Sequence, residues 1–116
     1  MQFAILFYES ADDFSARLDP ARTDYWQGWA SYSRSIGQSG KLVSGAALNG
    51  PEVGATLKSG TVQDGPYAET REQLGGFFIV EANDMEEAMR IAARSPTAGT
   101  GAVEIRPVLP TTTSED

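Results

Sequence analysis

The sequence predicts one α+β domain. Short apolar runs of strand length alternate along the chain with two segments in which apolar residues have helical spacing. The composition is typical of a globular protein, with 41% hydrophobic and 22% charged residues in a chain of 116. A chain of this length buries roughly two-thirds of its unfolded surface on folding. We therefore expect a single core in a domain spanning residues 1–110, followed by a polar tail at 111–116.

The N-terminal part predicts a strand, a long helix and a second strand. Residues 2–8 are apolar on both faces, which is typical of a central strand. After an acidic loop, Asp19 and Pro20 predict the N-cap and first residue of a helix that continues to about Ser39. The residues at helical spacing on its core-facing stripe are Tyr25, Trp29, Tyr32 and Ile36. Residues 41–48 predict the next strand.

The middle of the chain predicts three further strands. Two short strands, at residues 53–58 and 61–63, lie on either side of a Ser-Gly pair and form a hairpin. Residues 75–82 then predict a long strand. It is apolar on both faces, with Phe77 on one and Phe78 on the other, so we expect both faces to be covered.

The C-terminal part predicts a second helix and a last strand. Asp84 and Glu87 match a capping box at the start of the helix, and Pro96 ends it. Residues 103–108 predict the last strand. This order of elements matches a ferredoxin-like domain with a hairpin inserted in its middle. Both helices then cover one face of the sheet, and the opposite apolar face needs a partner, because monomers rarely expose apolar patches above several hundred Å².

The composition excludes several classes of function. The net charge of -7 has no compensating basic block, so we expect neither nucleic acid nor a membrane surface as a partner. Cysteine and histidine are both absent, which excludes disulfides, thiolate or histidine metal sites and Ser-His-Asp triads. We expect no cofactor, and any general base is a carboxylate, a tyrosine or a lysine. With no signal peptide or membrane span in the pattern, we expect a cytoplasmic protein.

The most informative segment is residues 64–76, which read Asp-Gly-Pro-Tyr-Ala-Glu-Thr-Arg-Glu-Gln-Leu-Gly-Gly. A turn fixed by proline precedes a run of polar side chains. The segment resembles the Asp-Gly-Pro-Phe-Ala-Glu-Thr-Lys-Glu-Gln-Leu-Gly-Gly signature of the DGPF branch of the YCII-related proteins, with Tyr67 and Arg71 as departures. The resemblance continues to Val108 and, more loosely, back to Met1. It implies a dimeric α+β barrel, an architecture shared with many small bacterial enzymes of ring and quinone chemistry.

Asp64 and Tyr67 are the candidate catalytic residues. The DGPF pattern matches Asp64, and a carboxylate at a strand end beside a proline-fixed turn can point into a cleft. Asp-Gly-Pro is equally good turn chemistry, in which the carboxylate accepts hydrogen bonds from backbone amides. Tyr67 is a candidate proton donor or, alternatively, a core or interface aromatic. Glu69 is a candidate ligand-binding residue or, alternatively, a solvated loop charge.

Tyr8, Trp26 and Arg106 are further candidates for ligand binding. Tyr8 and Trp26 are suited to an aromatic wall for a planar ligand, and the alternative is that they make core or dimer contacts. By the two-residue period of the last strand, Glu104 and Arg106 face away from the helices if Val103 faces toward them. There the charged pair lines a polar pocket or forms a structural network across the dimer.

The sequence leaves two functions open. One is an enzyme that transfers protons on a small cyclic or carbonyl compound, with Asp64 as acid or base and Tyr67 or Arg106 stabilising developing charge. The other is a non-catalytic small-molecule-binding or regulatory homodimer, which the family's frequent gene neighbourhood with sigma factors favours. DGPF relatives often carry His or Tyr just before the last strand, whereas this chain has Thr100, which cannot titrate near neutral pH.

Overall fold

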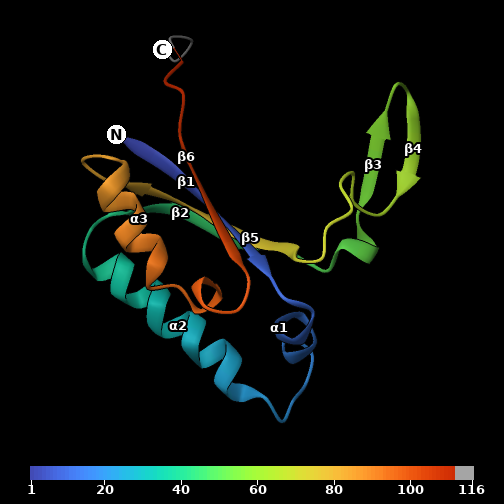
Figure 1. Cartoon of the computed structure of the whole chain (residues 1–116), viewed down its shortest axis with the longest axis horizontal. Helices are drawn as coiled ribbons and strands as arrows, with labels where there is room; N and C mark the ends of the chain where they lie inside the picture. The colour runs from blue at the N-terminus through green and yellow to red at the C-terminus, as the bar shows by residue number, and fades with distance from the viewer. Residues whose placement is uncertain (112–116) are drawn as a thin grey trace.

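The computed structural model describes residues 1–111, and the rest of the predicted 111–116 tail lies outside the described residues (Figure 1). The elements in chain order are β1 (Gln2–Glu9), α1 (Ala11–Ala16), α2 (Thr23–Gln38), β2 (Leu42–Ala47), the 3₁₀ turn Pro51–Val53, β3 (Ala55–Lys58), β4 (Thr61–Asp64), β5 (Gln73–Glu81), α3 (Met85–Ala93), the 3₁₀ turn Pro96–Ala98 and β6 (Ala102–Pro107). The predicted strands match these bounds to within two residues at each end.

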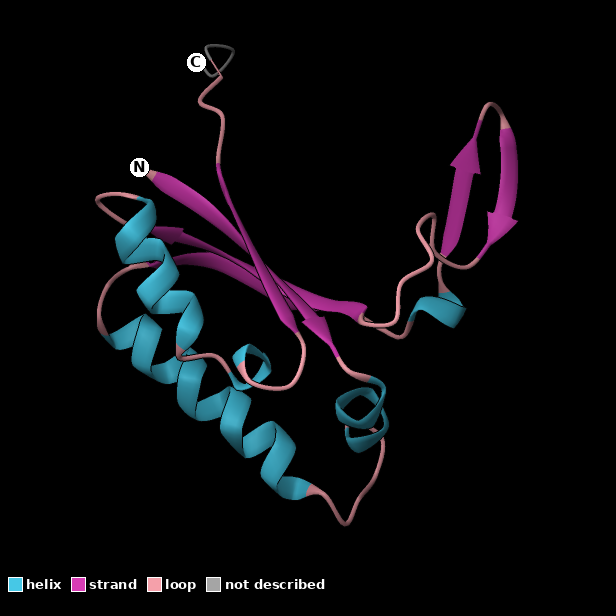
Figure 2. Cartoon of the chain, viewed as in Figure 1, coloured by secondary structure: helices cyan, strands magenta, loops and turns pink. Residues whose placement is uncertain are grey.

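The main sheet has the strand order of a ferredoxin-like domain. Within the described residues it is four-stranded and antiparallel, in the order β2-β5-β1-β6, and β3 and β4 form a separate two-stranded hairpin. Figure 2 shows α2 and α3 on the same side of the sheet, and the hairpin extending away from it. The predicted α+β architecture with an inserted hairpin is therefore confirmed.

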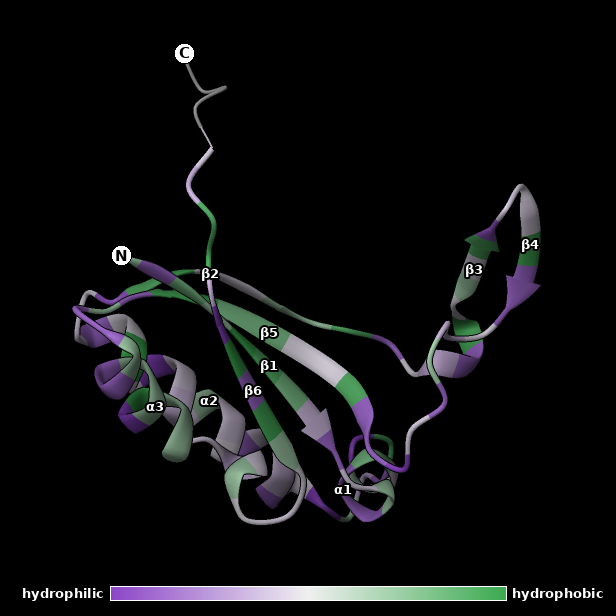
Figure 3. Cartoon of the chain, turned by 45° about the horizontal axis from the view of Figure 1, so that its top comes forward, coloured by the Kyte–Doolittle hydropathy of each residue, from purple (hydrophilic) through white to green (hydrophobic). Residues whose placement is uncertain are grey.

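The core lies between the sheet and the two long helices. The hydrophobic colour of Figure 3 follows most of β1 and β5 through the middle of the sheet, and it alternates with the hydrophilic colour along β6. The buried core residues are Phe3, Ile5, Phe7, Tyr32, Ile36, Val80, Ala82, Ala88, Ile91 and Ala92. Phe78 stacks on Tyr32 with ring centroids 5.6 Å apart and meets Phe7 edge-on at 5.2 Å. The predicted aromatic stripe of the first long helix thus faces the core, where each fully buried apolar side chain stabilises the fold by roughly 1.5–3 kcal/mol.

The opposite face of the sheet is apolar and carries no helix among the described residues (Figure 2). Leu6 of β1 pairs with Phe77 of β5 on this face, and both residues are partly exposed. Glu104 and Arg106 lie on the same face of β6 and form an ion pair of 2.7 Å. Because Val103 packs against the core, the predicted orientation of this charged pair away from the helices is confirmed.

A short helix, α1, occupies residues that the sequence predicts as an acidic loop. Ser10 caps it by accepting a hydrogen bond of 3.2 Å from the amide of Asp13. Only Ala16 of this helix is buried, so the element has no apolar stripe long enough to reveal it by periodicity.

The start of α2 also differs from the prediction. Asp19 does not cap this helix, which begins at Thr23 with no side-chain hydrogen bond at its N-cap. The Asp19 carboxylate instead accepts a hydrogen bond of 2.9 Å from the amide of Ala21. The Asp-Pro pair therefore forms a turn before the helix, because an Asp that bonds its own backbone two residues on favours an Asx turn as readily as a cap.

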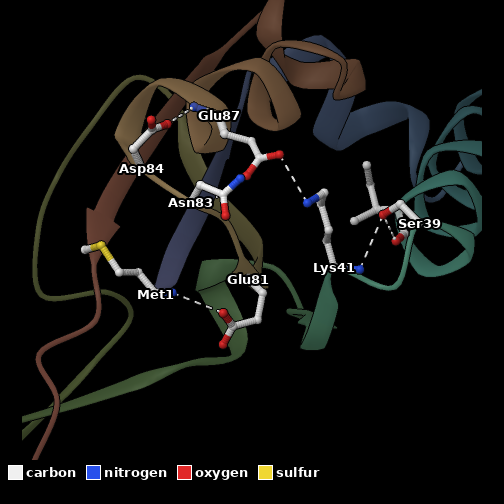
Figure 4. Close-up of polar contacts among 8 residues, drawn as sticks. Met1, Ser39, Lys41, Glu81, Asn83, Asp84 and Glu87 are labelled. Carbon is white, nitrogen blue, oxygen red and sulfur yellow. Dashed lines mark hydrogen bonds and ion pairs between the residues drawn. The ribbon is translucent and has the colours of Figure 1, made fainter.

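The capping of α3 is confirmed. The carboxylate of Asp84 accepts from the Glu87 amide at 2.8 Å, and that of Glu87 accepts from the Asn83 amide at 2.7 Å (Figure 4). Glu87 also pairs with Lys41 at 3.1 Å, which ties the start of α3 to the residue before β2. At the end of β5, the Glu81 carboxylate pairs with the N-terminal amine of Met1 at 3.1 Å.

The hairpin of β3 and β4 has little packing of its own. Leu57 lies opposite Val62 in the ladder, and these two side chains are 71% and 68% exposed. At its base, the Gly65 amide donates a hydrogen bond of 2.8 Å to the Gly54 carbonyl. A two-stranded hairpin without a packed face is only marginally stable in water, so this arm depends on its own ladder and its anchored base.

Candidate functional site

A cavity of about 320 Å³ lies between α2 and the β2–β5 side of the sheet. Its wall is mostly apolar and aromatic, with Phe7, Trp26, Trp29, Leu42 and Phe78. The polar side chains on the wall are Glu9, Arg17, Tyr25 and Ser33. An apolar hollow with a few converging polar groups is the usual form of a small-molecule site.

Glu9, the last residue of β1, is a buried carboxylate in this cavity. It is 2% exposed, and the Tyr25 hydroxyl donates a hydrogen bond to its Oε1 atom. The Nε atom of Arg17 lies 3.8 Å from the same oxygen. Burial raises the pKa of Glu9 above its ordinary value, while the Tyr25 hydrogen bond and the Arg17 charge act in the opposite direction. The group therefore holds a proton more readily than an exposed glutamate.

A bulge in β5 makes room for this carboxylate. Phe7 pairs with Gly76 and Tyr8 pairs with Leu74, so Gly75 is the extra residue of β5. A Cβ atom on Gly75 would lie 1.8 Å from Oε2 of Glu9. The Glu9 carboxylate thus occupies space that only a glycine leaves open at this position.

Arg17, just after α1, is held from several sides. Its guanidinium lies 4.4 Å from the ring centre of Phe14 and 5.4 Å from that of Trp26, and it donates a 3.2 Å hydrogen bond to the Gly75 carbonyl. The Trp26 indole donates to the Arg17 carbonyl at 3.1 Å. Arg17 therefore presents a fixed positive charge to Glu9.

Tyr25 and Trp29 lie one helical turn apart on α2 and complete the polar group. The pKa of Tyr25 is raised, first by burial and then by its hydrogen bond to Glu9. The Trp29 indole N–H acts against this shift from beside the Tyr25 oxygen, although the geometry of the pair falls short of a full hydrogen bond. The Trp29 N–H group is therefore enclosed by protein beside the Tyr25 hydroxyl.

The structure places Asp64, Tyr67 and Glu69 away from this cavity. Asp64 and Glu69 line a separate, open hollow of about 480 Å³ at the base of the hairpin. The Asp64 carboxylate accepts no hydrogen bond from a described residue, so it does not cap the turn in which Gly65 has φ +89°. Tyr67 is 70% exposed, with the Lys58 ammonium 5.3 Å from its ring centre. A functional role for these three residues stays a prediction.

Tyr8, Arg106 and Trp26 are not brought together within one chain. Phe7 and Glu9 face the helices, so Tyr8 between them faces the helix-free side of the sheet, where Arg106 also lies. Trp26 lies on the helix side, on the wall of the cavity. An aromatic wall made of Tyr8 and Trp26 therefore does not form in a single copy.

Glu9 and Arg17 were not predicted as site residues, and Tyr25 was predicted only as a core residue. One signal was available, because Glu9 follows Phe3, Ile5 and Phe7 at the core-facing period of β1. A carboxylate in that phase is buried, and a buried charge requires a charged or hydrogen-bonding partner. This position therefore marks Glu9 as a candidate site residue.

Two features are absent from the part of the chain that the structure describes, namely a cluster of metal ligands and a membrane-spanning helix. Within residues 1–111, no group of three or more acidic side chains is arranged to hold a metal ion. The helices in the same range are too short or too polar for any of them to span a bilayer.

Comparisons with known proteins agree with this fold. The model of the YCII-related domain matches residues 1–112. An uncharacterised protein of Rhizobium meliloti (strain 1021) is 32% identical over 114 residues, which cover 93% of this chain and 92% of the relative. The solved structure of 5-chloro-2-hydroxyhydroquinone dehydrochlorinase from Burkholderia phenoliruptrix AC1100, in complex with 2,5-dihydroxybenzoquinone, aligns with a TM-score of 0.58. The two chains are 19% identical, and the alignment covers 99% of this chain and 100% of the dehydrochlorinase chain. The similarity is therefore one of fold.

Replacing Gly75 is expected to reveal the close contact with Glu9. Gly75→Ala should cost about 1–3 kcal/mol of unfolding free energy, because its Cβ atom overlaps the Glu9 carboxylate. In a Glu9→Ala background the overlap is gone, so the two changes should couple by about 1 kcal/mol or more in urea titrations. Gly99→Ala, where a Cβ atom meets nothing within 4 Å, is the matched control. Equal costs in both backgrounds would show that the carboxylate lies elsewhere.

The raised pKa of Glu9 predicts a pH dependence of stability. Above the ordinary carboxyl value of 4.5 the unfolded chain loses this proton while the folded protein retains it. The unfolding free energy of the wild type should therefore fall, relative to Glu9→Gln, as the pH rises from 4.5 through the folded-state pKa. The slope cannot exceed about 1.4 kcal/mol per pH unit for one proton. Urea titrations of both proteins between about pH 4 and 8 measure it, and parallel curves would contradict the shift.

Proposed function

The chain belongs to the YCII-related family, and we propose that it is a small-molecule enzyme that transfers protons at Glu9. The proposal rests above all on one observation, which is a buried carboxylate with a raised pKa on the wall of an apolar cavity. Titratable groups with perturbed pKa values gather at functional sites, although structural ion pairs also contain them. The adjoining cavity favours the functional interpretation, because a purely structural pair needs no hollow beside it.

The contacts of Glu9 assign different tasks to its two oxygens. Oε1 is held by Tyr25 and Arg17, whereas Oε2 accepts no hydrogen bond from any described residue. We therefore assign proton exchange with the substrate to Oε2. The Arg17 charge stabilises the ionised form, and burial favours the protonated form, so the group is suited to both accepting and returning a proton.

The size and chemistry of the wall favour a small ring or carbonyl compound. A cavity of about 320 Å³ lies at the lower end of the range for small-molecule sites. The dehydrochlorinase of similar fold acts, by its name, on a substituted hydroquinone, which is such a compound.

A ligand-binding protein without turnover is the second candidate, favoured by the number of aromatic side chains on the wall. A cytoplasmic location stays a prediction.

The test uses 1-indanone, a flat ketone with exchangeable hydrogens beside its carbonyl. We expect the wild type to accelerate exchange of these hydrogens in D₂O, followed by proton NMR, and Glu9→Gln to lose about 10²-fold of that acceleration. Glu86→Gln, an exposed carboxylate on α3, is the matched control and should retain it.

Asp64→Asn separates the two candidate sites in the same assay. Loss of exchange in Asp64→Asn, with retention in Glu9→Gln, would move the chemistry to the hairpin base and overturn the proposal. Absence of acceleration by the wild type, together with saturable binding of 1-indanone, would favour the binding protein.

We also propose that the protein is a homodimer formed through the helix-free face of the sheet. Leu6, Phe77 and Ile79 give this face an apolar centre that the described residues leave partly exposed. A second copy packed on it would bury that centre and bring the Glu104–Arg106 pairs of both chains into the interface. In this arrangement Tyr8 and Arg106 belong to the interface.

Two neighbouring phenylalanines test the dimer. Phe77→Glu is expected to give a folded monomer, because Phe77 lies on the helix-free face. Phe78→Glu is expected to unfold the domain, because Phe78 stacks on Tyr32 in the core. Sedimentation velocity and circular dichroism distinguish these results, and Met89→Glu on the exposed side of α3 is the control. A monodisperse wild-type monomer at micromolar concentration would contradict the dimer.

A further inference from the structure

The β3–β4 hairpin has one apolar face and one polar face. Residues that lie opposite each other in the ladder share a face, so Leu57 and Val62 lie together, with Ala55 and Asp64 nearer the base. The side chains on the other face are all polar and belong to Thr56, Lys58, Thr61 and Gln63. This alternation is typical of strands that pack against protein on one side and face water on the other.

The described residues of the same chain leave this apolar face exposed. Leu57 and Val62 are 71% and 68% exposed. Figure 1 shows the hairpin standing clear of the rest of the domain, and the Cα radius of gyration is 15.6 Å, whereas a compact domain of this length has about 13 Å. At the base, the Thr56 hydroxyl donates a hydrogen bond of 2.8 Å to the Gly65 carbonyl, and the Gly65 amide donates to Gly54. The arm is therefore anchored at one end and presents its apolar face to the outside.

The hairpin lies on the helix-free side of the sheet. Figures 1 and 3 both show it beyond the start of β5, on the side away from α2 and α3. This is the side to which we assign the second copy. A molecule packed on the helix-free face therefore has the arm beside it.

The size of the helix-free face also favours a contribution from the arm. Four strands about 4.8 Å apart, with the 8 residues of β1 setting the length, give this face a footprint of roughly 500 Å². A typical stable interface buries about 800 Å² on each partner. The face alone is smaller than such an interface, and an arm from each copy supplies further apolar area. Packing on a second copy would in turn stabilise a hairpin that is marginal by itself.

We propose that the apolar face of the β3–β4 hairpin packs on the second copy of the chain in the homodimer. This inference rests on the proposed homodimer and adds a contact that lies outside the sheet. In a two-fold symmetric dimer the contact forms twice, once from each arm. The interface then has the helix-free faces at its centre and the Leu57–Val62 pair of each copy at its side.

Two adjacent residues on opposite faces of the arm test the proposal. Val62→Glu and Gln63→Glu each add one negative charge, but only the first places it on the apolar face. Val62→Glu should raise the Kd of the dimer about tenfold or more in sedimentation equilibrium, because a charge replaces a buried apolar side chain. Gln63→Glu is the matched control and should leave the Kd within about twofold, since an exposed charge contributes little. A Kd for Val62→Glu equal to that of the wild type would overturn the proposal.

Mixed dimers of the wild type give a second measurement that requires no variant. One copy carries ¹³C-labelled Leu and Val methyl groups, the other is unlabelled, and isotope-filtered nuclear Overhauser spectra detect only contacts between the two. We expect the methyl groups of Leu57 and Val62 to show contacts with protons of the unlabelled copy. If the wild type is a dimer but these methyl groups contact only their own chain, or neither chain, the arm inference is wrong and the dimer stands. If the wild type is a monomer at micromolar concentration, both are wrong.

Discussion

β1 runs through the centre of the sheet, between β5 and β6, and its two-residue alternation controls the rest of the structure. Phe3, Ile5 and Phe7 point toward the helices and form the middle of the core. The residues between them point to the open face and define the surface that we assign to a second copy. Glu9 continues the core-facing phase, so the same alternation that builds the core also carries a carboxylate into the cavity.

The carboxylate is tolerated because its surroundings come from three separate parts of the chain. Gly75 has no Cβ atom and so leaves space for the carboxylate, Tyr25 donates a hydrogen bond to it, and Arg17 places a positive charge beside it. Breaking such a buried pair by removing one partner is costly, because the other charge remains buried and uncompensated. The arrangement is therefore mutually dependent, and a change at one member alters the protonation of Glu9 as well as the local packing.

Much of the fold could be predicted from local patterns, whereas the cavity could not. The strands and the Tyr25–Ile36 stripe follow from periodicity within single elements, and the Asp84 cap follows from the spacing of two residues. α1 and the start of α2 were missed because short helices and Asx turns have weak periodic signals. Glu9 continues the core-facing period of β1, but the space for its carboxylate depends on a bulge in a strand that pairs with β1 from far along the chain, which no local pattern shows. The resemblance carried by residues 64–76 favoured Asp64, which lies on the hairpin side of the molecule.

The β3–β4 hairpin, with its exposed Leu57–Val62 pair, divides the molecule into parts of unequal stability. Its ladder shares no strand pairing with the main sheet, so it can open locally at a lower free energy than the whole domain. Such an opening leaves the order β2-β5-β1-β6 and the Glu9 cavity intact. Strands β3 and β4 can consequently change in length and sequence with little effect on the core.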